Sequence, residues 1–166
     1  MNLPAETSSN DSLPPVSLRP EAPLDEGFLY EVYASTRADE LALTNWDEPT
    51  RRMFLQQQFN AMRVGYRSMF PTGEFMIIEM AGQPVGRMVL DRGATEIRVV
   101  DLALLPARQN QGIGTFLMRQ VCANAGKPVR LCVLKNNRAR FWYERMGFIP
   151  IGERGVYDEL EWRPVK

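Results

Sequence analysis

The sequence predicts a mixed α/β fold in which a mostly antiparallel sheet contains one parallel pair of strands. Two observations carry this prediction. Apolar segments 75–80 and 85–91 flank the turn sequence AGQP, and a third apolar segment, 95–105, follows them, as in an antiparallel meander. A helical pattern over 112–125 then separates segment 95–105 from another apolar strand, 129–134. Such strand–helix–strand connections typically join parallel neighbours.

The chain has 166 residues, a length that suits one domain, which we place at residues 16–166. Residues 1–15, MNLPAETSSNDSLPP, are rich in Ser, Pro and Asn, and they have neither the basic nor the apolar segment of a signal peptide. We therefore expect a flexible N-terminal tail and a cytoplasmic location.

The elements before the meander are one strand and two helices. A short strand is expected at 16–19, and Asp25 is expected to cap a helix over 25–37. The stretch 38–48 is ambiguous, because its Asn, Trp and Asp residues suggest a loop. A long helix is predicted at 49–70, where apolar side chains follow helical spacing: Leu55, Phe59, Met62, Tyr66 and Met69.

The elements after the meander complete the domain. The helix over 112–125 ends at Gly126, a residue that suits the turn after a helix. A short helix is predicted at 138–145, and a closing hairpin at 148–163.

Composition narrows the chemistry. Lys plus Arg and Asp plus Glu each number 20, so no overall basic field favours nucleic acid, and no apolar run is long enough to span a membrane. The chain has no histidine and no C-x-x-C pair, which argues against histidine-based nucleophilic catalysis and against a metal site. Cys122 and Cys132 fall in predicted buried elements and are expected to be reduced thiols.

The stretch LLPARQNQGIGTFL, residues 104–117, has the composition of an anion-binding loop before a helix. A dinucleotide fingerprint would need a third glycine where Leu117 stands, and a P-loop would need Lys-Ser/Thr after Gly114, where Thr115 and Phe116 follow. The backbone N–H groups of about residues 110–115 remain as phosphate donors at a helix N-terminus, whose dipole favours an anion.

Two motifs in this half of the chain resemble the GCN5-related N-acetyltransferase (GNAT) superfamily. Gln109-x-x-Gly112-x-Gly114, after a strand and a proline, is similar to that family's acetyl-CoA motif. The sequence NNRARFWYERMGF, from Asn136 to Phe148, resembles its N-x-x-A-x-x-x-Y-x-x-x-G-F signature. The resemblance covers residues 75–163 and implies the GNAT fold, in which acetyl-CoA lies between two splayed parallel strands.

The resemblance also implies roles for particular residues. The backbone at Leu102, Ala103 and Leu104 would meet the pantetheine arm and thioester, and Asn136, just after the second strand, would contact the arm. Tyr143 occupies the position of the family's general acid and cofactor contact; the alternative is a core tyrosine. The residues implied to hold the pyrophosphate are Gln109, Asn110, Gln111, Gly112, Ile113, Gly114 and Thr115.

The general base is open. Asp101 and Glu96 lie on the strand that leads to the cofactor, and Glu79 is a weaker candidate that would instead pair across the hairpin. Asp101 stands in the otherwise apolar run VVDLAL, where a carboxylate is costly without a purpose. The alternative is a structural ion pair with Arg98 or Arg87.

The function implied is transfer of an acetyl group from acetyl-CoA to a primary amine by direct attack, without an acyl-enzyme and without a metal. The acceptor is unidentified: a small amine, an amino acid, an aminoglycoside-like compound and a protein amine are all open, as is a homodimer. One alternative is a non-catalytic acyl-CoA-binding or regulatory module of the same fold. A nucleic-acid-binding domain that uses the arginines of 138–145 is disfavoured by the zero net charge.

Overall fold

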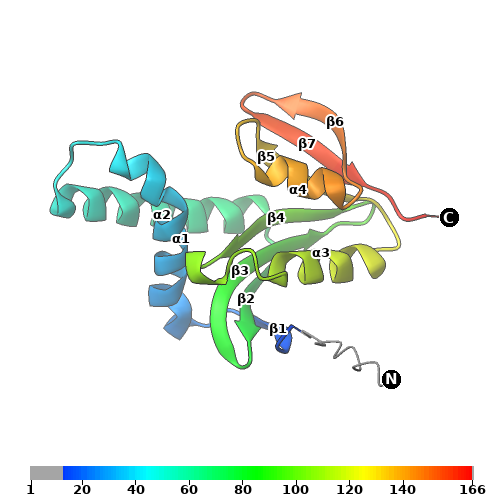
Figure 1. The fold of residues 1–166 in the computed structure, drawn as a ribbon, viewed down its shortest axis with the longest axis horizontal. Helices are drawn as coiled ribbons and strands as arrows, with labels where there is room; N and C mark the ends of the chain where they lie inside the picture. Colours follow the sequence, from blue (N-terminus) through cyan, green and yellow to red (C-terminus); the bar gives the residue numbers. More distant parts are fainter. Residues whose placement is uncertain (1–12, 166) are drawn as a thin grey trace, which may run out of the picture.

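A computed structural model describes residues 13–165, which form one seven-stranded sheet in the order β1-β2-β3-β4-β5-β7-β6 (Figure 1). The strands are β1 (Val16–Pro20), β2 (Glu74–Met80), β3 (Gln83–Arg92), β4 (Ile97–Leu104), β5 (Val129–Leu134), β6 (Ile149–Arg154) and β7 (Tyr157–Trp162). The helices are α1 (Glu26–Ala42), α2 (Glu48–Met69), α3 (Ile113–Ala123) and α4 (Ala139–Arg145), with short 3₁₀ turns at Pro23–Asp25 and Pro106–Arg108. The expected N-terminal tail lies mostly outside the described residues.

The sheet confirms the predicted fold class. Strands β1 to β4 pair antiparallel in sequence order, β4 pairs with β5 in parallel, and β5, β7 and β6 pair antiparallel. The β2–β3 turn is tight because Ala81 and Gly82 both have positive φ, 50° and 76°. Such a turn matches the twist of a hairpin.

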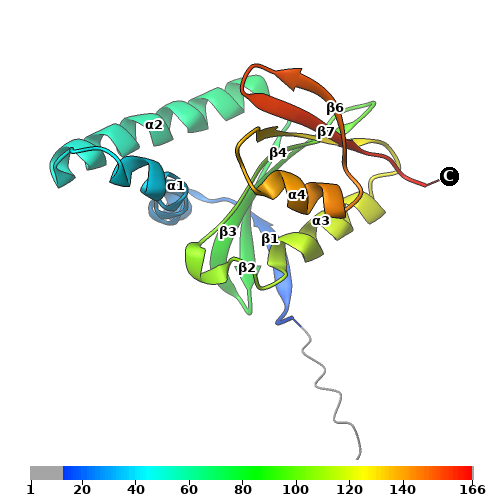
Figure 2. The same cartoon turned by 45° about the horizontal axis from the view of Figure 1, so that its top comes forward.

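Helices cover both faces of the sheet (Figure 2). Neighbouring residues on a strand point to opposite faces. Accordingly, Ile77 joins a core with Leu29, Tyr33 and Phe59 of α1 and α2, whereas Ile78 joins the larger core under α3 and α4. Helices α1 and α2 therefore cover one face of the sheet, and helices α3 and α4 cover the other.

Helix α1 is longer than expected, because the ambiguous stretch 38–48 continues it to Ala42. Leu41 is buried and extends the apolar face of the helix by another turn. Helix α2 begins where Asp47 accepts a hydrogen bond from the Thr50 N–H at 3.0 Å. The far ends of α1 and α2 form an arm that projects from the body of the sheet (Figure 1).

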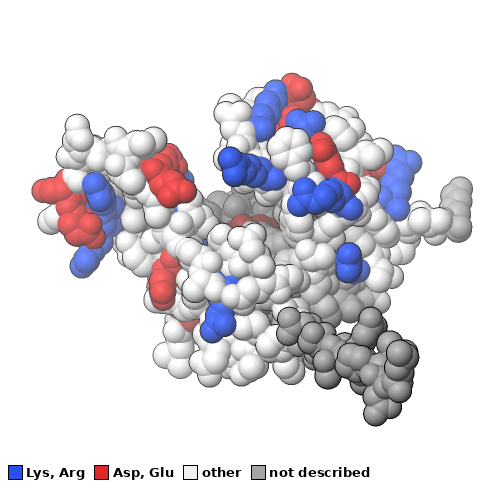
Figure 3. All heavy atoms as spheres, in the orientation of Figure 1, with Lys and Arg blue, Asp and Glu red and all other residues white. Residues whose placement is uncertain are grey.

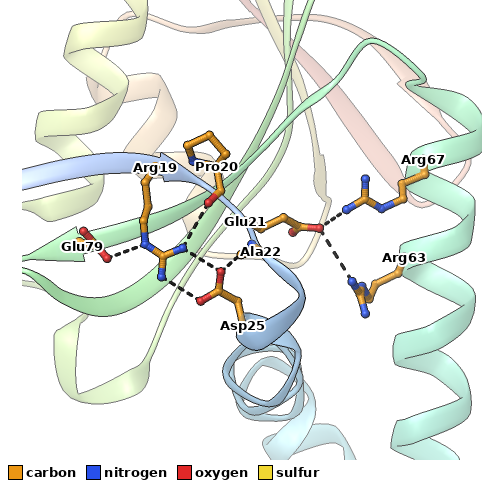
Figure 4. Close-up of polar contacts among 8 residues, drawn as sticks. All are labelled: Arg19, Pro20, Glu21, Ala22, Asp25, Arg63, Arg67 and Glu79. Atoms are coloured by element: carbon orange, nitrogen blue, oxygen red, sulfur yellow. Dashed lines mark hydrogen bonds and ion pairs between the residues drawn. The ribbon is translucent and has the colours of Figure 1, made fainter.

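Ion pairs fasten the near ends of α1 and α2 to the sheet (Figure 4). The Arg19 guanidinium of β1 lies 2.8 Å from the Asp25 carboxylate and 2.7 Å from that of Glu79. Glu21 pairs with Arg67 and, at 3.9 Å, with Arg63, both of α2. The root of α1 and the last turns of α2 are thus held against the first two strands.

These contacts correct two expectations. Asp25 precedes α1, but its side chain makes no capping bond to that helix; it accepts from the Ala22 N–H at 2.7 Å and from Arg19 instead. Glu79 pairs with Arg19 of β1 and not across the β2–β3 hairpin. A sequence pattern shows the residue type at a helix start, but it does not show a partner far away in the chain.

The cysteines also differ from the expectation. Cys122 is buried in α3, where burial raises the pKa of its thiol to about 11, but Cys132 on β5 is exposed. Strand β5 alternates, so only Val129, Leu131 and Val133 face the core. Within residues 13–165, no helix is long and apolar enough to cross a membrane.

Candidate active site

The candidate site lies where the neighbouring strands β4 and β5 separate. They pair only at Ile97↔Val129, Arg98↔Arg130 and Val99↔Leu131. Beyond these pairs β4 continues beside β3 alone and β5 beside β7 alone, which confirms the splayed parallel pair. The edges that face each other across the opening carry backbone groups available to a ligand.

A bulge in β4 lies beside this opening. Val89 of β3 pairs with Asp101 and Leu90 pairs with Val99, so Val100 is an extra residue in β4. A bulge bends its strand and increases the local twist. It therefore helps to turn β4 away from β5 at the point where their pairing ends.

An open groove of about 900 Å³ lies at the separated ends of the two strands. In the space-filling view, the molecule is hollowed between the α1–α2 arm and the lobe of β5, α4, β6 and β7 (Figure 3). Ten of the residues expected in the site line the groove: Leu102, Ala103, Leu104, Gln109, Asn110, Gly112, Ile113, Gly114, Thr115 and Tyr143.

The loop before α3 forms one wall of the groove. Asn110 and Gly112 have positive φ, 59° and 85°, which Asn and Gly tolerate better than other residues. The first helical bond of α3 runs from the Phe116 N–H to the Gly112 carbonyl. Among the described residues, no acceptor bonds to the N–H groups of 110–115, so six donors meet at the positive end of an eleven-residue helix.

Side chains hold this loop in shape. The Gln109 amide donates to the Leu104 carbonyl at 3.1 Å, and the Gln111 amide donates to the Ala107 carbonyl at 2.9 Å. Gln111 does not line the main groove; it lies in a second groove on the other side of the α3 N-terminus. The glutamine side chains thus stabilise the loop and leave its backbone donors free.

Helix α4 forms the opposite wall. The Trp142 indole donates to the Thr115 hydroxyl at 3.0 Å and so ties α4 to the first turn of α3. Asn136 does not line the groove, but its neighbour Asn137 does. The Asn137 side chain also accepts from the Ala139 N–H at 2.9 Å, which fixes the start of α4.

Several groove residues were missed by sequence reasoning: Thr36, Asn137, Arg138, Ala139, Trp142 and Arg145. Arg138 and Arg145 are exposed and have no ion pair with the described residues, so they place positive charge on the rim. Their spacing of seven residues, two turns of one helix, could have indicated a shared face. Thr36 belongs to α1 and could be brought here only by the tertiary fold.

Tyr143 lies within the groove wall and is buried, with 9% of its surface exposed. Its ring packs on Trp142 at 4.5 Å and on Phe148 at 5.6 Å, measured between centroids. Burial, and next the negative charge of Asp101, raise the pKa of the Tyr143 phenol to about 12. The phenol therefore keeps its proton at neutral pH and is available as a donor.

The two expected base candidates have different surroundings. The Asp101 carboxylate pairs with Arg87 at 2.7 Å, and its burial raises its pKa against the opposing effect of that guanidinium. Glu96 lies just before β4, at the closed end of the strand pair, and binds Arg98 and Arg130, each at 2.8 Å. Neither Glu96 nor Asp101 lines the groove.

A mixed sheet that opens between two parallel strands, beside a helix N-terminus with free donors, defines the acyl-CoA N-acyltransferase fold. The comparisons agree with this class. A family model described as an acetyltransferase (GNAT) domain matches residues 71–150, which hold the splayed pair, the loop and α4. By this match, residues 71–150 carry a GNAT acetyltransferase domain.

Solved structures with the same fold cover nearly the whole chain. PaiA N-acetyltransferase from Thermoplasma acidophilum, in complex with coenzyme A, is 18% identical, with 90% of this chain and 99% of that chain covered at a TM-score of 0.68. An acetyltransferase from Thermus thermophilus is 18% identical, with coverage of 90% and 97% at 0.65. Ard1 from Thermoplasma volcanium is 21% identical, with coverage of 91% and 99% at 0.60. A search of curated protein sequences finds no significant match.

Proposed function

We propose that this protein transfers the acetyl group of acetyl-CoA to a primary amine by direct attack of the amine on the thioester. The observation that carries the proposal is the groove in which six free N–H donors lie next to the opening between β4 and β5. The family assignment and the coenzyme A complex of PaiA N-acetyltransferase support it.

Acetyl-CoA would extend along the groove. Its pyrophosphate would accept hydrogen bonds from the N–H groups of 110–115, and its pantetheine arm would pair with the backbone of Leu102–Leu104 like an added strand. Arg138 and Arg145 would attract the phosphates, because no acidic residue lines this groove. The thioester would then reach the opening between β4 and β5.

The reaction needs two proton transfers. The amine nitrogen would form a bond to the carbonyl carbon while the carbon–sulfur bond breaks. We assign the amine proton to the Asp101 carboxylate, because burial raises its pKa and makes it a stronger base than an exposed aspartate. We assign the proton for the departing CoA thiolate to the Tyr143 phenol, which lines the groove.

A panel of amines, assayed with acetyl-CoA by the release of free thiol, tests the proposal. We expect turnover with at least one class of acceptor among small amines, amino acids, aminoglycosides and peptides with a free N-terminus or lysine. Calorimetric titration with CoA runs beside the panel. CoA binding without turnover across the panel would favour the alternative, a non-catalytic acyl-CoA-binding module, and no binding would reject both.

A further inference from the structure

Asp101 projects toward α1 and α2, and the bulge in β4 is the reason. Before the bulge, Val99 pairs with Leu90 and belongs to the core under α3 and α4. Without an extra residue, Asp101 would share that face, because side chains alternate with a period of two. Val100 shifts the alternation by one, so Asp101 shares its face with its partner Val89 and with Arg87.

On this face Asp101 lines a small, partly open pocket of about 20 Å³, whose wall also includes side chains of α1 and α2. The volume is close to that of one water molecule. The titratable or charged groups around the carboxylate come from four elements and the segment before α1: Glu21 before α1, Tyr33 of α1, Arg63, Tyr66 and Arg67 of α2, Arg87 of β3, and Tyr143 of α4.

Among these groups, Arg87 makes the direct contact with Asp101. Its Nε lies 2.7 Å from an Asp101 carboxylate oxygen, and only 6% of the residue is exposed. The guanidinium is held from other sides, since it lies 3.4 Å from the Met62 sulfur and 5.8 Å from the centre of the Tyr33 ring. A buried charge that loses its partner is strongly disfavoured, so the two side chains depend on each other.

We propose that Arg87 is a positioning residue that orients the Asp101 carboxylate and keeps it charged, so that it can accept the proton of the amine. This inference rests on the proposed acetyl transfer. Burial raises the pKa of Asp101, and Arg87 is the first effect that opposes the rise. Without the guanidinium, the carboxyl would hold its own proton to higher pH, and the base would be lost over part of the working range.

The test uses Arg87→Met, which keeps an apolar stem and removes the charge, and Arg87→Lys, which keeps the charge. Arg98→Met is the matched control, because Arg98 is also a partly buried, ion-paired arginine but pairs with Glu96 and Glu159. The Asp101 carboxyl is titrated by NMR in protein labelled with ¹³C at the aspartate carboxyl carbon. Asp101→Asn identifies its signal.

We expect the Asp101 pKa to rise by about one unit or more in Arg87→Met, and to stay near the wild-type value in Arg87→Lys and Arg98→Met. The acid limb of kcat/KM should move by the same amount, which lowers activity about tenfold at a pH below the limb. If Arg87→Met does not fold, Arg87→Gln takes its place. We then expect a raised Asp101 pKa in folded Arg87→Gln and an unchanged Asp101 pKa in Arg98→Met.

An unchanged Asp101 pKa in folded Arg87→Met or Arg87→Gln would overturn the inference. The NMR titration needs no turnover, so it separates this outcome from a failure of the proposed function. If the pKa moves but the acid limb of kcat/KM does not, Asp101 is not the base, and the inference is rejected for catalysis.

Discussion

At the scale of single residues, Tyr143 has the most specific proposed role. Its position follows from packing, because Trp142 and Phe148 enclose the ring while one side lines the groove. A phenol with a pKa of about 12 is a weak acid in water, but it can protonate a thiolate that forms beside it. The structural role and the catalytic role can be separated, because only the second one needs the hydroxyl.

Tyr143→Phe keeps the ring and removes the hydroxyl. We expect kcat to fall by about 10²- to 10⁴-fold, while the affinity for acetyl-CoA changes little. Tyr30→Phe is the control, since Tyr30 of α1 packs on Phe59 of α2 and does not line the groove. Steady-state kinetics from pH 6 to 9 check the prediction; wild-type turnover across that range would leave Tyr143 as a core residue.

The sequence indicated some groove residues better than others. Gly112, Gly114 and Tyr143 belong to motifs in which spacing fixes the register, and all three line the groove. Asn136 and Glu96 were expected in the site but lie outside the groove. Asn136 is one residue from the groove residue Asn137, and Glu96 lies at the opposite end of β4. Sequence order does not show which side of a turn faces a ligand. Of the two ion-pair partners expected for Asp101, Arg87 is the one observed. The choice between them depended on the bulge at Val100, and a single extra residue leaves little trace in an apolar run.

At the scale of elements, the helices α1 and α2 depend on ion pairs with the first two strands. Periodicity predicted both helices, but it could not predict what holds them, since Arg19 and Glu79 are distant in sequence. Arg19 lowers the pKa of Asp25 from 3.8 to about 2, chiefly through its hydrogen bond. Stability from this pair is therefore present above about pH 4 and is lost as the pH falls through 2.

Asp25→Asn should lower the free energy of unfolding by about 1 to 2 kcal/mol at pH 7, after allowance for solvent around the partly exposed Arg19. The difference from wild type should shrink between pH 4 and pH 2, because protonation then weakens the wild-type pair. Urea unfolding at several pH values measures it. Asp39→Asn, on the exposed side of α1, is the control, and a difference that does not vary with pH would contradict the ion-pair explanation.

At the scale of the whole molecule, two layers of helices enclose a sheet that opens in the middle. The fold class was predictable because the turn sequences, the apolar strands and the order of elements all agree with one topology. The strand order at the far edge was harder to predict from the sequence, since β7 and not β6 lies next to β5.

The claim on which the whole account depends is that the loop before α3 holds the phosphates of CoA. Gly112 and Gly126 flank the two ends of α3, both have positive φ, and a Cβ built on either meets no atom within 4 Å. Gly112→Ala and Gly126→Ala therefore carry a similar backbone cost of about 1 kcal/mol. Only the first one places a methyl group in the groove.

Calorimetric titration of wild type and both variants with acetyl-CoA is the most direct measurement. We predict binding by wild type and by Gly126→Ala with similar affinity, and an affinity at least about tenfold weaker in Gly112→Ala, equivalent to about 1.4 kcal/mol. Equal affinities in a folded Gly112→Ala protein and in wild type, or no binding by wild type, would contradict the account.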